Sequence, residues 1–407
     1  MTQLPAPSHL DLVQNVIGSS NRIFGESWNS DHHLREFVGQ RAGHLSTQLS
    51  LIAQLRSGRK IRAEVFHALG SFDARFCALI LSWPKKAKPV KLDEAIEIAK
   101  GLDARQPCME PVQTYLKPKP EGGTRRIWVS GPRRRALQCL AKLILQAIWG
   151  PAKFEFAQRG RGRDKAMDQF TQSILQKGGT RWILTADIES CYGSFNREAL
   201  LKIISLPRAV IENCIFITKD VPINDISNML TNTSEIAVLS GLPQGSLASP
   251  YIVSKLIEPV LEKLSGKVVL NYVDDIGVGT FTKAEAQANE QKLGDQLKDH
   301  PAGPLFMKCH IAPLGKPIDF LGYRIRRRWK QYGGGARLTP CAKSFKRFEI
   351  RLRSLLEKNP KSEKYAVAES YTKNWRTSFH LWDRSETGDV LLDLEAHHVI
   401  QSATFHK

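Results

Sequence analysis

The sequence lacks the features that mark several classes of protein. Its seven cysteines lie far apart, and no C-x-x-C pair suggests a zinc site or a redox motif. No apolar run approaches the ~20 residues that a membrane-spanning helix needs. The segment Met1 to Ala6 lacks the basic-then-apolar order of a secretory signal. We therefore expect reduced, mostly packed cysteines, no association with a membrane, and a cytoplasmic location.

Long low-complexity stretches and internal repeats are also absent. The 407 residues are 42% hydrophobic and 24% charged, which are ordinary proportions for a soluble globular protein. At ~150 residues per domain, this length predicts two or three domains with a sizeable core. Neither a disordered chain nor a solenoid fits these observations.

Acidic residues are few relative to basic ones. The chain has 59 Lys and Arg against 40 Asp and Glu, so its net charge is +19 and its pI about 9.7. Such an excess predicts a polyanionic partner, although a generally basic, solvated surface is the simpler alternative. Between Arg324 and Arg376 there are 16 Lys and Arg, four Glu and no Asp, a net charge of +12. This concentration favours nucleic acid.

Periodicity divides the chain into three parts. Apolar residues at helical spacing predict helices over most of residues 1–110. Short strand-like runs between helices follow over 111–323, which predicts an α+β fold. In the basic region 324–407, Phe345, Phe348, Leu352, Leu355 and Leu356 form a helical apolar stripe, with Lys343, Lys346, Arg347 and Arg351 on the opposite side. We expect this helix to lie along a nucleic-acid backbone; a solvated helix face is the alternative.

Two strand-like runs end at acidic residues. The run from Trp182 to Ala186 delivers Asp187, and the run from Val268 to Tyr272 leads into Asp274-Asp275, which we interpret as a hairpin turn before a returning strand. Carboxylates from separate strands form a hard oxygen site that suits Mg²⁺. Two such ions support in-line nucleotidyl transfer. Taken alone, an Asp pair in a turn is more simply explained by local hydrogen bonding.

The order of five motifs decides between these explanations. Along the chain they are Lys119–Ile127 (KPEGGTRRI), Asp187–Tyr192 (DIESCY), Gly241–Pro250 (GLPQGSLASP), Tyr272–Asp275 (YVDD) and Phe320–Tyr323 (FLGY). The sequence from about Tyr115 to Trp382 resembles the reverse transcriptase family in this set and order. The resemblance implies a right-hand polymerase with fingers, a ferredoxin-like palm and a helical thumb. We expect an amino-terminal helical extension at 1–110, fingers and palm at 111–323, and a thumb at 324–407.

The resemblance also implies roles for individual residues. Asp187 and Asp274 would bind two Mg²⁺ ions, with Mn²⁺ as a possible substitute, while Asp275 supports the site and the Ile188 carbonyl adds an oxygen ligand. Lys308 falls roughly where the family has a lysine that protonates the leaving pyrophosphate; a solvated surface lysine is the alternative.

The remaining implied roles concern the nucleotide and the primer. Lys119 and Arg125 or Arg126 would hold the triphosphate, with Arg126 standing where relatives commonly have proline. Tyr192 would stack under the sugar and exclude a 2′-hydroxyl, while Gln244 and Gly245 would lie against the nucleotide. Phe320, Leu321, Gly322 and Tyr323 would grip the primer end, although the first two would also serve as core.

The subgroup follows by analogy only. No endonuclease or zinc module is evident, which argues against a mobile intron enzyme with its own DNA-cleaving domain. Diversity-generating reverse transcriptases usually have another residue in place of Gln244, so this glutamine argues against that group. We expect a compact bacterial enzyme of antiviral defence that copies RNA into DNA from dNTPs, with a structured noncoding RNA as its partner. A retron or other retroelement enzyme, a catalytically vestigial RNA-binding module and an RNA-synthesising polymerase remain alternatives. The oligomeric state is not predicted.

Overall fold

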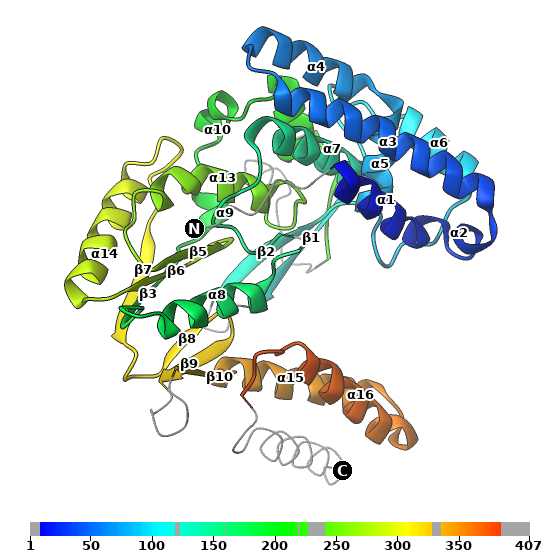
Figure 1. Ribbon diagram of the computed structural model, residues 1–407. Helices are drawn as coiled ribbons and strands as arrows, with labels where there is room; N and C mark the ends of the chain where they lie inside the picture. The colour runs from blue at the N-terminus through cyan, green and yellow to red at the C-terminus, as the bar shows by residue number, and fades with distance from the viewer. Residues whose placement is uncertain are drawn as a thin grey trace. The chain divides into compact units, whose positions relative to one another are not determined.

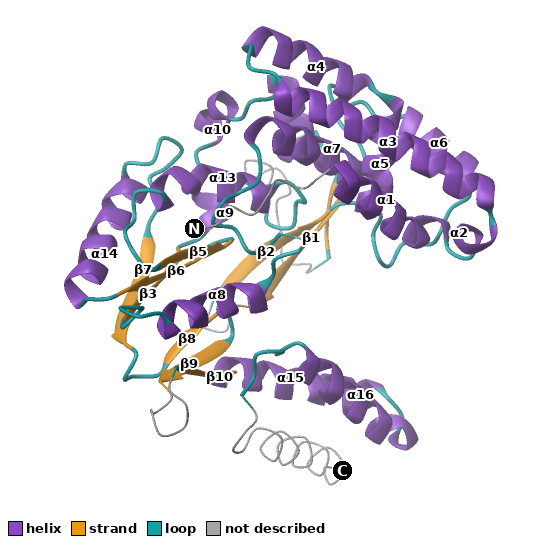
Figure 2. Ribbon diagram, in the orientation of Figure 1, coloured by secondary structure: helices purple, strands orange, loops and turns teal. Residues whose placement is uncertain are grey.

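The computed structural model describes residues 9–118, 123–158, 160–218, 220–226, 241–327 and 335–383. It confirms the predicted α+β fold (Figures 1 and 2). The chain forms two compact units that interleave along the sequence. The first comprises Met1–Lys153, Glu189–Pro259 and Leu297–Leu305, and the second comprises Phe154–Ile188, Val260–Gln296 and Phe306–Lys407. The domain boundaries expected from the sequence stay a prediction, because this division follows compactness alone.

Helices dominate the amino-terminal part of the first unit, as expected from its periodicity. They are α1 (His9–Phe24), α2 (Ser27–Ser30), α3 (His32–Gln54), α4 (Gly58–Gly70), α5 (Phe72–Ser82), α6 (Leu92–Lys100) and α7 (Pro132–Trp149). Helix α5 is buried along most of its length and packs against α1, α3, α6 and α7. The Glu110 carboxylate accepts hydrogen bonds from the Arg133 and Arg134 amides and so caps the start of α7.

A three-stranded sheet completes the described core of the first unit. Its strands β1 (Val112–Pro118), β2 (Thr124–Val129) and β4 (Ile223–Asp225) lie in the order β2-β1-β4. Trp128 packs there against Val112, Ile217 and Val221. The unit's further helices are α9 (Cys191–Ser194), α10 (Arg197–Ile203), α11 (Arg208–Val210), the π-helix η1 (Ile211–Ile215) and most of α13 (Ser249–Leu261).

A four-stranded antiparallel sheet forms the centre of the second unit. Its strands are β3 (Trp182–Ile188), β5 (Val268–Tyr272), β6 (Asp275–Thr280) and β7 (Met307–Pro313), in the order β5-β6-β3-β7. Helices lie between β3 and β5 and, as α14 (Lys283–Lys298), between β6 and β7. This connectivity and strand order are those of the predicted ferredoxin-like palm. Helix α8 (Arg163–Leu175) packs against the sheet through Met167 and Phe170.

The basic carboxy-terminal region is only partly helical. It opens with β9 (Tyr323–Arg327), which pairs with β8 (Ile318–Phe320) and β10 (Ala336–Pro340). Helix α15 (Ala342–Lys358), the 3₁₀ turn η3 (Lys361–Glu363) and helix α16 (Lys364–Thr377) follow. Helices α15 and α16 agree with the expected helical thumb. The strands are an addition to that expectation, and their buried Tyr323, Ile325 and Leu338 alternate with exposed or half-exposed arginines.

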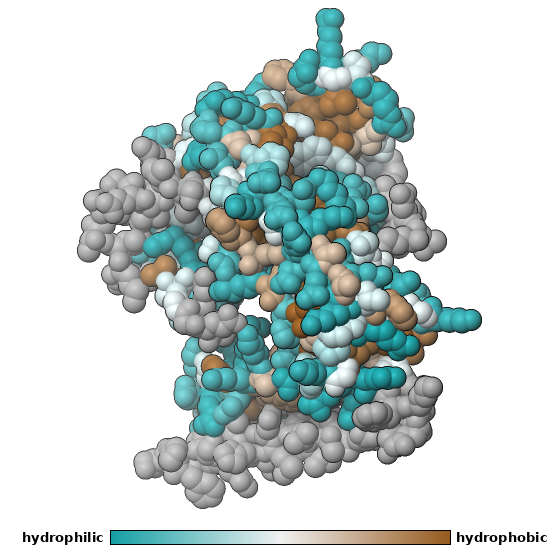
Figure 3. All heavy atoms as spheres, turned by 90° about the vertical axis from the view of Figure 1, so that its left-hand side faces the viewer, coloured by the Kyte–Doolittle hydropathy of each residue, from teal (hydrophilic) through white to brown (hydrophobic). Residues whose placement is uncertain are grey.

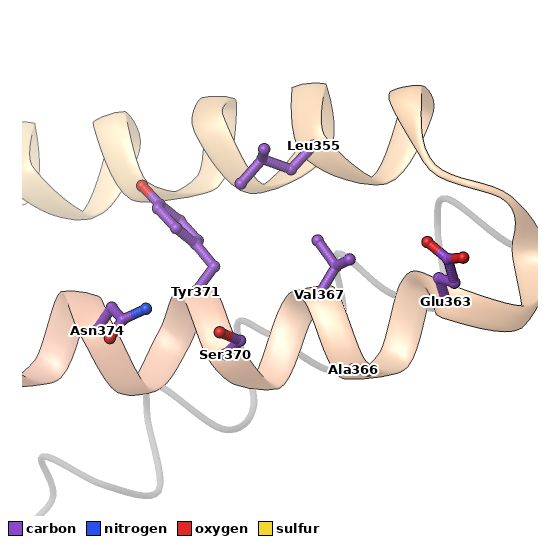
Figure 4. A pocket seen from close by; sticks show the side chains of 7 residues that line it. All are labelled: Leu355, Glu363, Ala366, Val367, Ser370, Tyr371 and Asn374. Atoms are coloured by element: carbon purple, nitrogen blue, oxygen red, sulfur yellow. The ribbon is translucent and has the colours of Figure 1, made fainter. Parts of the chain in front are cut away.

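The thumb helices join the core of the sheet. Phe348, Leu352 and Leu356 of α15 are fully buried in the same cluster as Phe170 and Leu270. Figure 4 shows Tyr371 of α16 pointing toward α15, and its ring stacks on Phe348 with 5.4 Å between centroids. A groove between the two helices is lined by Leu355, Glu363, Ala366, Val367, Ser370, Tyr371 and Asn374 (Figure 4). No predicted site residue lies in that groove.

In the view of Figure 3, hydrophilic residues surround separate apolar areas over the described part of the chain. No single helix in the described part of the chain is long and apolar enough to cross a membrane; the bent pair of α4 and α5 meets that test only when both are counted together. Five of the seven cysteines are buried, in agreement with the expectation that most of them are packed.

Candidate active site

The predicted acidic residues meet at one end of the four-stranded sheet. Asp187 of β3 lies directly opposite Asp275 of β6. Directly opposed residues on antiparallel strands share a face of the sheet, so both carboxylates leave the same side. Asp274 occupies the turn before β6, and its carbonyl accepts a hydrogen bond from the Ile188 amide at 3.2 Å. Thus the end of β3 and the turn are tied together.

The position of the turn corrects the expectation from sequence by one residue. Tyr272 pairs with Asp275, so the two turn residues are Val273 and Asp274, and Asp275 begins the returning strand. The pairing with Asp187 explains the shift, because extending β6 by one residue adds a cross-strand neighbour on each side.

Electrostatics show that the three carboxylates affect one another. Burial raises the pKa of Asp275 to about 7, and the negative charges of Asp274 and then Asp187 contribute to the rise. Arg347 of α15 opposes it. A cluster of mutually repelling carboxylates has an excess of negative charge that a divalent cation would neutralise. The same observation places Arg347 within electrostatic reach of the acidic residues.

The donor set fits hard divalent ions. Asp187, Asp274, Asp275 and the Ile188 carbonyl supply oxygen atoms only, which Mg²⁺ prefers. Ile188 has a buried side chain, so only its backbone could serve. Within the described ranges, three ligand atoms approach one another within 4.8 Å only at the exposed His32, His33 and Glu36. The fit therefore rests on strand register and shared charge, not on a preformed cage.

Lys308 occupies a position consistent with its predicted role. It lies on β7 directly opposite Asp187, on the other side of β3 from Asp275. Its side chain is exposed and leaves the same face of the sheet as the two carboxylates. The match of Lys308 to the family's lysine is loose in the sequence, and the sheet register adds that Lys308 is a direct neighbour of Asp187.

The predicted primer-grip residues form the β8–β9 hairpin. Leu321 and Gly322 have φ angles of 49° and 81°, and Phe320 pairs with Tyr323, as in a two-residue turn of type I′. Gly322 suits the second turn position because glycine takes positive φ without strain. Its carbonyl accepts a hydrogen bond from the Ser344 hydroxyl at 2.8 Å. The hairpin tip is therefore fixed to the start of α15.

Its flanking aromatic residues are part of the core. The Phe320 ring lies over Gly277, where an added Cβ would come within 2.8 Å of it. Gly277 follows Asp275 by two residues and faces the same side of β6. Tyr323 is fully buried and donates a hydrogen bond to Asp164 at 2.7 Å. Burial is the first cause of the raised pKa of Tyr323. Only Leu321 and Gly322, which are half-exposed, remain candidates to touch a primer.

The described nucleotide-binding residues all belong to the first unit, where backbone hydrogen bonds connect the segments of Tyr192, Gln244 and strand β2. The Tyr192 carbonyl accepts a hydrogen bond from the Leu242 amide at 2.7 Å, and the Gln244 carbonyl accepts one from the Trp128 amide at 2.9 Å. The loop containing Gln244 and Gly245 thus connects Tyr192 to strand β2. A Cβ on Gly245 would lie 2.2 Å from the Trp128 carbonyl oxygen, which explains why glycine is needed.

Strand register separates the two candidate arginines. Arg125 and Arg126 are neighbours on β2, so their side chains leave opposite faces. Arg126 is half-buried and donates to the Thr114 hydroxyl at 3.4 Å, whereas Arg125 is exposed. Arg125 is the better candidate to meet a triphosphate. Lys119 lies outside the described residues.

One further cation belongs with Arg125. Lys117 of β1 is exposed and directly opposite Arg125, on the same face of the sheet. The sequence places Lys117 in the same basic group as Arg125, and this group is expected to hold the triphosphate and the template strand. Lys117 precedes Arg125 by eight residues across a glycine-containing segment, a spacing that is typical of paired positions in a hairpin.

Comparison with known proteins agrees with these observations. The family described as reverse transcriptase (RNA-dependent DNA polymerase) matches residues 117–325, just over half of the chain. The chain belongs to the reverse transcriptase family. This confirms the predicted resemblance and the enzyme class of the family, RNA-directed DNA polymerase.

Two curated relatives of this reverse transcriptase are proteins named for introns. An uncharacterized 91 kDa protein in the cob intron of Schizosaccharomyces pombe is 26% identical over 171 residues, 42% of this chain and 20% of the relative. A putative COX1/OXI3 intron 1 protein of Saccharomyces cerevisiae is 25% identical over 163 residues, 38% of this chain and 18% of the relative. This chain thus spans about a fifth of their length.

Among solved structures, an apo telomerase from Candida tropicalis, truncated from its C-terminal domain, is similar at a TM-score of 0.38 and 12% identity. The similarity covers 80% of this chain and 96% of the telomerase chain. At that level it carries no argument about this chain's chemistry.

Proposed function

We propose that this chain is an RNA-templated DNA polymerase that extends a primer with dNTPs. The observation that carries the proposal is that Asp187, Asp274 and Asp275 lie together at one end of the palm sheet. Asp187 is directly opposite Asp275 in the strand register, and the charges of Asp274 and Asp187 raise the pKa of Asp275. Such clustering is unfavourable for folding unless a cation or substrate is to be bound, because like charges are brought together.

Two divalent ions fit this donor set. Asp187 and Asp274 would hold them, with Asp275 and the Ile188 carbonyl in support; Mg²⁺ is the proposed ion and Mn²⁺ a substitute. When bound, the ions would activate the primer hydroxyl and stabilise the leaving pyrophosphate. Lys308, on the same face as Asp187, would hold a proton for that leaving group.

The first unit would bind the incoming nucleotide. Arg125 and Lys117 form an exposed cationic pair on one face of the β1–β2 hairpin, suited to a triphosphate. Tyr192, half-buried beside the glycine loop, would contact the sugar and disfavour a 2′-hydroxyl. Gln244 and Gly245 would lie against the nucleotide. Preference for rNTPs over dNTPs in direct competition would instead support the alternative of an RNA-synthesising polymerase.

Helix α15 would hold the primer–template duplex. Its buried side joins the palm core, while Lys343, Lys346, Arg347 and Arg351 are exposed. Arg347 lies close enough to Asp275 to influence its pKa, so this basic face begins beside the acidic residues. Cations in that position would neutralise backbone phosphates without reading sequence.

The partner and biological setting are the finer part of the proposal. A structured noncoding RNA would serve as template, and the DNA product would act in bacterial antiviral defence in the cytoplasm. The intron-named relatives favour the alternative of a retroelement enzyme. Sequencing the RNA and DNA that copurify with the protein from its native operon context distinguishes these settings.

Activity is tested with purified protein, a primed RNA template, labelled dNTPs and Mg²⁺. The double variant Asp274→Ala, Asp275→Ala should lose incorporation. A matched control is Asp295→Ala, Asp299→Ala, which removes the same charge from exposed positions near the end of α14. Full incorporation by the first variant would overturn the proposal and favour a vestigial RNA-binding module.

A further inference from the structure

A buried carboxylate lies beside the acidic turn. The segment around Glu155 extends the palm sheet at the outer edge of β5: the Phe154 carbonyl accepts from the Asn271 amide, and the Phe156 amide donates to the Asn271 carbonyl, both at 2.8 Å. Glu155 is thereby placed next to Asn271, two residues before Val273. Its side chain is only 5% exposed.

The Glu155 carboxylate collects hydrogen bonds from the turn itself. It accepts from the Val273 amide at 3.3 Å to Oε1 and 3.2 Å to Oε2. The Asn271 side-chain amide donates to Oε2 at 2.9 Å, and the Ala157 amide donates to Oε1. A carboxylate is acceptor-only when ionised, so it can satisfy these converging donors together.

Val273 is the residue that needs such support. Its φ is 63°, a left-handed value that is unfavourable for a β-branched side chain. Asp274, the second turn residue, does not have a positive φ, so the turn has the pattern of type II′, whose first central residue is usually glycine. A non-glycine residue held in such a conformation at a metal site must be fixed by its surroundings.

We propose that Glu155 is a positioning residue for the catalytic turn. Its carboxylate accepts a hydrogen bond from the Val273 amide and so holds Val273 in its left-handed conformation. This conformation in turn sets the direction of the carboxylate of the next residue, Asp274. The expected effect on catalysis rests on the proposed function. The conformational part stands on the hydrogen bonds alone.

The side chain can be removed without detaching its segment. The Glu155 carbonyl accepts from the Gln158 side-chain amide at 2.9 Å and from Arg161 at 2.8 Å. The bonds that Phe154 and Phe156 make with the Asn271 backbone also involve main-chain atoms only. Truncation at residue 155 should therefore loosen the turn while the segment remains on the edge of β5.

The first test needs no activity. Hydrogen exchange of the Val273 amide should be about tenfold faster in Glu155→Ala than in the wild type, because its acceptor is lost. Glu155→Gln should be intermediate, since its oxygen can still accept. The matched control is Glu258→Ala, which removes a carboxylate that caps the Lys153 amide and does not contact the turn. Unchanged exchange in Glu155→Ala would overturn the proposal.

The second test measures catalysis. Glu155→Ala should lower kcat about 10–100-fold and raise the Mg²⁺ concentration for half-maximal rate, with a nearly unchanged KM for dNTP. Adding Val273→Gly should recover at least about fivefold in kcat, because glycine takes positive φ without a side-chain clash. Failure of this rescue would refute the proposal that Glu155 acts on catalysis by fixing the conformation of Val273. If the wild type incorporates no dNTP on any template, the proposed function fails, and the exchange result still decides the conformational role.

Discussion

The acidic turn and the glycine loop are held in place by opposite means. At the turn, a side chain stabilises an unfavourable backbone conformation: the Glu155 carboxylate accepts a hydrogen bond from the amide of Val273, which has a positive φ. In the loop, side chains are absent where the backbone comes close: a Cβ at Gly241 would lie 2.3 Å from the Tyr192 carbonyl oxygen, and one at Gly245 2.2 Å from that of Trp128. The turn should therefore be damaged by removing atoms, and the loop by adding them.

The largest effect is expected from removing a charge at the acidic site. Asp187→Asn preserves the shape of the side chain but removes one of the carboxylates that would hold the metals. We expect dNTP incorporation in single-turnover experiments to fall by at least about 10³-fold, with an unchanged circular dichroism spectrum. Asp295→Asn on α14 is the matched control. An Asp187→Asn enzyme within tenfold of the wild type would place the metal site elsewhere.

Adding atoms to the loop should have the next largest effect. Gly245→Ala, where φ is 115°, forces a Cβ into the Trp128 backbone and should lower kcat/KM for dNTP about 10–100-fold. Gly193→Ala, at a position with open space around the added Cβ and no positive φ, should change it less than about threefold. Steady-state kinetics at several dNTP concentrations compare the two. Equal effects would show that close backbone approach is not what the loop requires.

A smaller effect is expected on the basic helix. Arg347→Ala should weaken binding of an RNA–DNA duplex severalfold. It should also reduce the slope of log affinity against log salt concentration by about one, the value for one lost phosphate contact. Arg353→Ala removes the same charge from α15, but Arg353 is paired with Glu349 at 2.9 Å and should contribute less. Fluorescence anisotropy over a range of salt concentrations measures both slopes. Identical slopes for the two variants would argue against α15 as the duplex-binding face.

The smallest effect concerns stability in the metal-free chain. Because the pKa of Asp275 is raised to about 7, the folded state favours its protonated form. The resulting stabilisation should be complete below about pH 4 and lost as pH rises through about 7. In EDTA, the rise in Tm from pH 7.5 to pH 5.5 should be larger for the wild type than for Asp275→Asn. The same rise in both proteins would show that Asp275 is not the group responsible.

Much of the palm was predictable because its signals are local. The β5 strand covers Val268–Tyr272, the run after Ser265-Gly266 that predicted a strand, and the α15 stripe of Phe348, Leu352 and Leu356 is buried as its spacing predicted. The one-residue shift of the turn was not predictable from the hairpin sequence, because the start of β6 depends on its pairing with Asp187, almost ninety residues earlier.

Other features depend on contacts that no local pattern shows. Glu155 stands between Phe154 and Phe156 in a segment without a marked motif, and its partners lie more than a hundred residues later at Asn271 and Val273. The choice between Arg125 and Arg126 required the register of β1 and β2. In the thumb, the arginines of β9 and β10 give these short strands the composition of a charged surface segment, which hides their alternation of buried and exposed residues.

The most direct test of the central claim is to sequence what the purified protein synthesises. A defined RNA template with an annealed primer, the four dNTPs and Mg²⁺ should yield DNA complementary to the template from the wild type and none from Asp187→Asn. Complementary DNA from both proteins in equal amount, or none from the wild type on any primed RNA, would contradict the account.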